Sequence, residues 1–170
     1  MKDFVTGKSI IDIGPEANRQ AVEKYLVNNK GYAREDILVD MELSLTVAGE
    51  AYHTKLDLVV MVDGSPFMVI KCAAGALGSR EREVVYAARV AQEIPIPFAV
   101  ASDGQTALVF DAVTRNQIGQ GLEAIPSPEQ AKQLILNTKA VSLSSERRER
   151  EKIIFRSYDM MNVNTAGNCC

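Results

Sequence analysis

Two acidic residues of this 170-residue chain stand where a carboxylate could take part in chemistry. Asp57 interrupts the apolar run LDLVVMV at residues 56–62, and Glu16 lies near the start of a segment with helical periodicity. Carboxylate oxygens are the ligands that hard cations such as Mg²⁺ prefer, and a divalent metal can activate water for hydrolysis. Glu16 and Asp57 are therefore the candidate metal ligands of a hydrolytic site.

Each of these acids also has an ordinary structural interpretation. A glutamate at a helix start is stabilised by the helix dipole, by about 0.3–1 kcal/mol. A buried aspartate in a strand needs a partner, and Lys71 follows the next apolar run, at residues 67–70. We favour an ion pair between Asp57 and Lys71, with metal binding as the alternative.

A group of basic residues near the middle of the chain is a second candidate site. Arg80 and Arg82 lie at the start of a predicted helix, and helix N-termini bind phosphate readily. Together with Lys71 they could hold the phosphates of a nucleic acid. Glu81 and Glu83 alternate with them in sequence, and mixed charges of this kind more often indicate a solvated helical face.

The spacing of apolar residues predicts the elements that position these side chains. Every second residue from Ile37 to Val47 is apolar, which is typical of a strand. Asp63-Gly64 is a hairpin signal, and Ser127-Pro128 is a helix start. We expect, in order, a helix at 15–30, strands at 37–47, 51–62 and 66–72, a helix at 80–92, strands at 98–101 and 106–111, and helices at 127–136 and 146–158.

The composition limits the class of protein. A hydrophobic content of 46% with 24% charged residues is typical of a globular chain. The net charge of −3 offers no electrostatic support for DNA binding. The three cysteines fit no zinc spacing, and their odd number favours a reducing cytosol. Since no apolar run approaches the roughly 20 residues of a membrane span either, we expect a cytoplasmic protein without a membrane partner.

We expect one domain with short extensions at its ends. The predicted boundaries are an N-terminal lead at 1–14, a domain at 15–158 and a flexible tail at 159–170. Within the domain, the core covers 15–112 and the C-terminal helices cover 127–158. The tail includes Cys169 and Cys170, whose role the sequence does not indicate.

An ordered set of short motifs runs through the core of the chain. The motifs are Glu16-Ala-Asn-Arg-Gln, Gly31-Tyr32, Asp57 in KLDLVV, the turn and strand GSPFMVI at 64–70, Tyr86-Ala87, Ser102-Asp103-Gly104 and Val109-Phe110-Asp111. This ordered set resembles the PD-(D/E)XK nuclease core, and in particular the N-terminal domain of type I restriction enzyme R subunits. The resemblance implies an α/β fold of the restriction-endonuclease-like type, with a three-layer core and a mixed central sheet of about five strands flanked by helices.

The resemblance also implies a nuclease site from which this sequence departs. The family pattern has an aspartate on one strand and a Glu-x-Lys on the next. Here Asp57 is kept, but Lys71-Cys72-Ala73 stands at the Glu-x-Lys positions and Arg82 at the family's helix glutamine. We therefore expect a degenerate, non-catalytic domain without a cofactor, whose nucleic-acid contacts would come from Lys71, Arg80 and Arg82.

Two alternatives remain open. The first is an active Mg²⁺-dependent DNA endonuclease that uses Glu16, Asp57 and Lys71, with a further acid migrated from another element, such as Glu42, Glu81 or Glu83. The second is a protein-interaction or dimerisation domain. The partners to consider are accordingly DNA, the other subunits of a restriction system, or a second copy of this chain.

Overall fold

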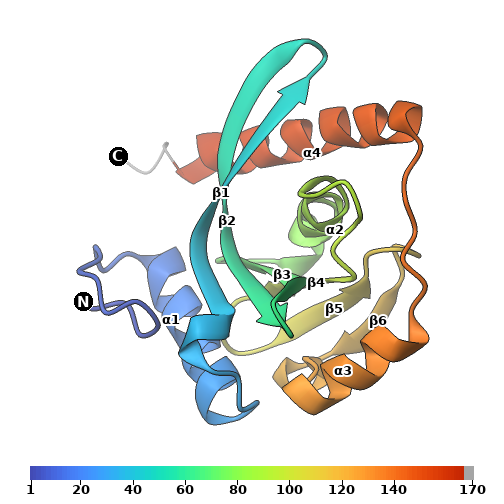
Figure 1. Cartoon of the computed structure of the whole chain (residues 1–170). Helices are drawn as coiled ribbons and strands as arrows, with labels where there is room; N and C mark the ends of the chain where they lie inside the picture. Colours follow the sequence, from blue (N-terminus) through green and yellow to red (C-terminus); the bar gives the residue numbers. More distant parts are fainter. Residues whose placement is uncertain (167–170) are drawn as a thin grey trace.

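The computed structural model describes residues 1–166, which form one mixed β-sheet with helices on both faces (Figure 1). In chain order the elements are α1 (Gly14–Asn28), η1 (Arg34–Asp36), β1 (Ile37–Val47), β2 (Glu50–Val62), β3 (Ser65–Cys72), η2 (Leu77–Arg80), α2 (Glu81–Val90), β4 (Phe98–Ser102), β5 (Ala107–Asp111), β6 (Gln117–Gln120), η3 (Leu122–Ala124), α3 (Pro128–Asn137) and α4 (Ser145–Ala166).

The six strands lie in the sheet in the same order as in the sequence. Neighbouring strands are antiparallel except β3 and β4, which are parallel. A parallel pair needs a crossover, and here α2 supplies it. The β2–β3 turn places Asp63 at φ +50° and Gly64 at φ +78°, so the predicted Asp-Gly hairpin turn is confirmed.

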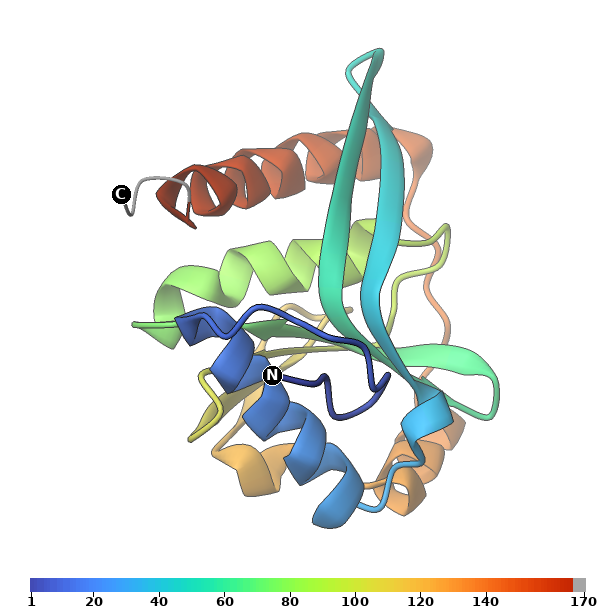
Figure 2. The same ribbon diagram turned by 90° about the vertical axis from the view of Figure 1, so that its left-hand side faces the viewer.

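The helices cover the two faces of the sheet in layers. Helices α1 and α3 pack on one face, where Val22, Leu26 and Ala131 join inward-facing strand residues such as Ile70. Helix α2 covers the opposite face through Val84, Val85 and Ala88. Figure 2 shows α2 lying between the sheet and α4. The domain is thus a three-layer α/β arrangement with α4 added outside α2.

The hairpin of β1 and β2 is longer than the other strands and extends past α2 to lie beside α4 (Figure 1). Leu43, Leu45 and Val47 of β1 belong to the same buried cluster as Phe155 of α4. The alternation that predicted β1 therefore has a physical cause, because one face of this outer hairpin packs on α4 while the other faces solvent.

The structure confirms most of the predicted elements and corrects two. Helix α3 begins as expected, with Ser127 and Gln130 forming a capping box. The sheet has six strands rather than about five, because Gln117–Gln120 pairs with β5 although its sequence QIGQ carries no strand alternation. The last helix, expected to end at residue 158, continues to Ala166, so much of the predicted tail is helical. Cys169 and Cys170 lie outside the described residues.

No helix within residues 1–166 combines the length and apolar character that crossing a membrane requires.

Candidate functional site

Asp57 and Lys71 meet on neighbouring strands, as the sequence predicted. Leu58 of β2 pairs with Ile70 of the antiparallel β3. Asp57 precedes Leu58 and Lys71 follows Ile70, so the two residues lie opposite each other. The Lys71 Nζ is 3.5 Å from Asp57 Oδ1, and Asp57 Oδ2 accepts a hydrogen bond of 2.8 Å from the Cys72 backbone N–H. Both oxygens of the aspartate are therefore engaged by groups of the protein itself.

Two further acids complete what we call the acid–lysine cluster, made of Asp57, Lys71, Glu83 and Asp159. Glu83 comes from α2, is 2% exposed, and places Oε1 3.4 Å from Lys71 Nζ. Asp159 comes from α4, is 4% exposed, and accepts a hydrogen bond from the Tyr52 hydroxyl. The space left among these residues is about 10 Å³, which is at the lower limit for one water molecule.

The electrostatics of the cluster favour a charged lysine. Burial acts to lower the pKa of Lys71, but the carboxylates of Asp57, Glu83 and Asp159 outweigh it and raise the pKa overall. Burial raises the pKa of Glu83 and of Asp57, and in both cases the Lys71 ammonium offsets part of the effect. The ammonium is thus the cation that balances these acids.

Glu16 lies in a different cluster, around Arg19 of α1. The Arg19 Nε donates to Glu16 Oε1 over 2.6 Å, and other nitrogens of the guanidinium lie 3.2 Å from Asp3 and 3.7 Å from Asp40. Within residues 1–166, no three histidine, cysteine or acidic side chains are grouped so that they could hold a metal. The two acids predicted as metal ligands are therefore not joined in a metal-binding group.

The three cations expected to form one phosphate pocket are divided between two surfaces. Arg80 turns toward the cluster, with Nη1 3.6 Å from Glu83 Oε2. Arg82 points away, is solvent-exposed, and donates from Nη1 to the Tyr158 hydroxyl over 3.0 Å. A groove of about 350 Å³ beside Arg82 is also lined by Tyr86 and Arg115.

Sequence reasoning named some members of the cluster and missed others. Glu83 was among the acids considered able to migrate into the site, and the structure brings it there. Tyr52 and Asp159 were missed, because they are 107 residues apart in sequence and neither belongs to a motif. Asp159 also lies beyond the position where the last helix was expected to end.

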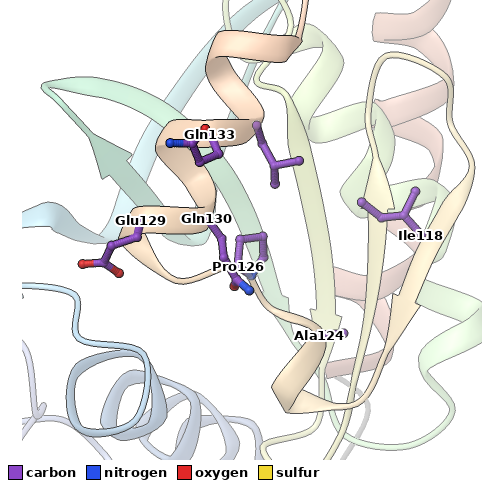
Figure 3. Close-up of a pocket in the computed structure, with 7 residues that line it drawn as sticks. Ile118, Ala124, Pro126, Glu129, Gln130 and Gln133 are labelled. Carbon is purple, nitrogen blue, oxygen red and sulfur yellow. The ribbon is translucent and has the colours of Figure 1, made fainter.

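A second concavity lies at the other end of the sheet, between β6 and α3 (Figure 3). It has a volume of about 520 Å³ and mostly apolar walls. None of the predicted site residues is in it. The lining residues are Ile118, Ala124, Pro126, Glu129, Gln130, Gln133 and Leu134.

The N-terminal segment is anchored on α1 by a buried glutamate. Glu23 is fully buried and accepts a hydrogen bond of 3.1 Å from the Val5 backbone N–H. Burial and the nearby charge of Asp3 raise its pKa to about 7, while Val5 and Arg19 act in the opposite direction. The folded protein therefore holds a proton on Glu23 at pH values where an unfolded chain has lost it.

This shift predicts a pH-dependent gain in stability from Glu23→Gln. Between the ordinary value of 4.5 and about 7, the unfolded chain binds fewer protons, so wild-type stability falls as pH rises through this window. The glutamine side chain of the variant does not ionise, so the variant does not lose stability in this pH window. We expect urea denaturation to give a variant that gains about 1–3 kcal/mol over wild type between pH 5 and pH 8. A constant difference, or an equal gain in the exposed-site control Glu35→Gln, would contradict the assignment.

Comparison with known proteins identifies the family of this chain. No curated protein and no solved structure matches the chain. A protein family described as "Type I restriction enzyme R protein N terminus (HSDR_N)" matches residues 14–126, and the six-stranded mixed sheet with its helices is consistent with the restriction-endonuclease-like α/β fold. Because the match spans more than half of the 170 residues, the chain belongs to the family of type I restriction enzyme R protein N-terminal domains.

Proposed function

We propose that this chain is a non-catalytic member of its family, acting as a binding module in the context of a restriction system. One observation carries the proposal: the Lys71 ammonium lies 3.5 Å from Asp57 and 3.4 Å from Glu83. It holds the place that the resemblance gives to an acidic metal ligand, at the first position of the Glu-x-Lys pattern.

The residues of the cluster do not fit a divalent metal. A metal ion there would need lone pairs from several oxygens, and both oxygens of Asp57 are already turned to Lys71 and to the Cys72 amide. Placing a second cation beside the Lys71 ammonium would also be repulsive. The lysine that would stabilise developing charge is missing as well, because Ala73 stands at its position.

A plasmid-cleavage assay tests this proposal. We expect neither the wild type nor Asp57→Ala to cut DNA with Mg²⁺ or with Mn²⁺. The reason is that no group in the cluster is arranged to activate water. Cleavage by the wild type that disappears in Asp57→Ala would contradict the proposal and establish an active site with relocated residues.

Nucleic-acid contact in such a module would rest mainly on the exposed Arg82. It lies beside Arg115 on a groove that also presents Tyr86, so a phosphate could reach this surface directly. Lys71 and Arg80 contribute less to this contact, because both already form ion pairs with Glu83.

A protein-interaction domain is the second candidate, and the apolar groove between β6 and α3 favours it. The two candidates differ at low ionic strength, where contacts to phosphate are strongest. Fluorescence anisotropy with a labelled DNA duplex at low salt is the discriminating measurement. Binding that weakens in Arg82→Ala supports nucleic-acid contact, and absence of binding favours the protein-interaction domain.

A further inference from the structure

Helix α4 lies outside the segment that matches the family and covers the acid–lysine cluster. The match ends at residue 126, whereas α4 begins at Ser145. Two of its side chains, Phe155 and Asp159, form walls of the small space around Asp57, Lys71 and Glu83. Figure 2 shows α4 along the outer side of α2, on the face of the molecule opposite α1.

The surface that α4 buries is unusually charged for a packed helix. Among its described side chains, the buried ones are Glu151, Lys152, Phe155 and Asp159. Three of these four carry ionisable groups, so Phe155 is the single apolar anchor among them. Helix α2 differs, because Val84, Val85, Ala87, Ala88 and Val90 bury an apolar stripe against the sheet.

Polar contacts hold α4 to three other elements. Glu151 receives two hydrogen bonds of 2.8 Å from Arg89 of α2. Asp159 accepts from Tyr52 of β2. On β1, the Thr46 carbonyl accepts from Lys152 Nζ over 3.3 Å. The contacts therefore join α4 to α2 and to the outer part of the β1–β2 hairpin.

Such an interface costs less to open than an apolar one of the same size. Ionised groups regain their hydration when they separate, and buried ion pairs often do little more than offset their desolvation. The segment before α4, residues 138–144, has no regular secondary structure and is mostly exposed. It can serve as a tether that lets the helix move without disturbing α3.

We propose that α4 is a lid, which opens as one unit and, when closed, limits access to the acid–lysine cluster, where the Lys71 and Asp57 side chains are 26% and 22% exposed. The sheet and α2 stay folded in the open form, because their own core is apolar and does not need α4 beyond the contact of Phe155. This inference goes beyond the proposed function and holds whichever ligand the uncovered surface accepts.

Hydrogen exchange followed by mass spectrometry on the full wild-type chain tests the lid. We expect the amides at 145–162 to exchange at one common rate, at least about tenfold faster than those of β3, β4 and α2. If α4 exchanged as slowly as the central strands, it would be an integral part of the fold and the proposal would be overturned.

A matched pair of variants sharpens this test. Phe155→Ala removes the buried anchor, and Ile153→Ala makes a similar change on the exposed side of the same helix. We expect Phe155→Ala to speed exchange of α4 on the order of 100-fold, with β3 and β4 unchanged, and Ile153→Ala to have little effect. Equal effects of the two changes, or loss of protection in β3 and β4 as well, would overturn the lid.

Chemical access to Lys71 gives an independent readout. Acetylation by an amine-reactive ester, followed at Lys71 by mass spectrometry, should accelerate in Phe155→Ala in parallel with α4 exchange. An unchanged acetylation rate beside faster α4 exchange would show that the helix does not guard the cluster. Neither readout uses DNA, so a failure of nucleic-acid binding would count against the proposed function and leave the lid standing.

Discussion

Replacing Glu151 with alanine is expected to destabilise the native state, with α4 docked, by about 3–5 kcal/mol. Arg89 is 1% exposed and directs two hydrogen bonds of 2.8 Å to the Glu151 carboxylate. Its remaining nitrogen, Nη1, donates to the carbonyls of Ala112 and Val113. Loss of the carboxylate leaves a buried guanidinium without a counter-charge, which is one of the costliest single changes in a protein interior.

Urea denaturation and hydrogen exchange together measure this loss. Arg147→Ala is the matched control, because Arg147 also contacts Glu151, at 3.3 Å, but its side chain is 45% exposed. An exposed pair contributes at most about 1 kcal/mol. If α4 undocks before the rest unfolds, faster exchange at 145–162 will carry most of the effect. Similar losses from Glu151→Ala and Arg147→Ala would mean that burial of Arg89 does not set the strength of this pair.

Lys71→Glu is expected to make the stability of the domain depend on divalent metal. The substitution returns an acid to the family's position and leaves Asp57, Glu83 and Asp159 without their shared cation. Without metal, crowding of the carboxylates should cost about 3–5 kcal/mol. A metal present at 100 times its dissociation constant would restore about 2.7 kcal/mol.

Thermal unfolding with and without MgCl₂ or MnCl₂ measures this effect. For a domain of this size we expect the midpoint of Lys71→Glu to rise by roughly 5–10 °C with metal, and that of the wild type to stay constant. Lys139→Glu, an equal charge change at an exposed position, should also be insensitive to metal. A wild type that responds to metal as strongly as Lys71→Glu would contradict the assignment of Lys71 as the cation of the cluster.

Local pattern was enough to predict five of the six strands that the structure describes within residues 1–166. The alternation from Ile37 to Val47 and the Asp63-Gly64 turn determine β1 and the β2–β3 hairpin, because both signals depend on residues close in sequence. Counted from this turn alone, Asp57 would lie opposite Ile70, but a register shift between Val60 and Met61 moves the pairing by one residue and brings Asp57 opposite Lys71. The contact between Asp57 and Lys71 was predicted because a buried acid needs a partner, and the irregularity that aligns the two residues is visible only in the structure.

The family assignment could also be reached from sequence, because ordered motifs survive even where the chemical residues change. Asp57 remained recognisable beside KLDLVV, and the replacement of Glu-x-Lys by Lys71-Cys72-Ala73 was readable from the aligned strand. The predicted loss of metal chemistry came from residue types, which need no coordinates. Glu16 pairs with Arg19, three residues along the same helix, and does not join Asp57. The cations expected to form one pocket are divided between two surfaces, because residue type does not report the direction in which a packed side chain points.

Tertiary structure alone decided what surrounds the site. Asp159 and Tyr52 meet across 107 residues, and Arg89 and Glu151 across 62. No periodicity records such contacts, because a charged residue that pairs in the interior looks in sequence like one that faces water. The polar stretch at 145–162 reads as a solvent-exposed helix, yet it buries Glu151, Lys152 and Asp159. Strand β6 could not be predicted from its own residues either, because it forms by pairing with the open edge of β5.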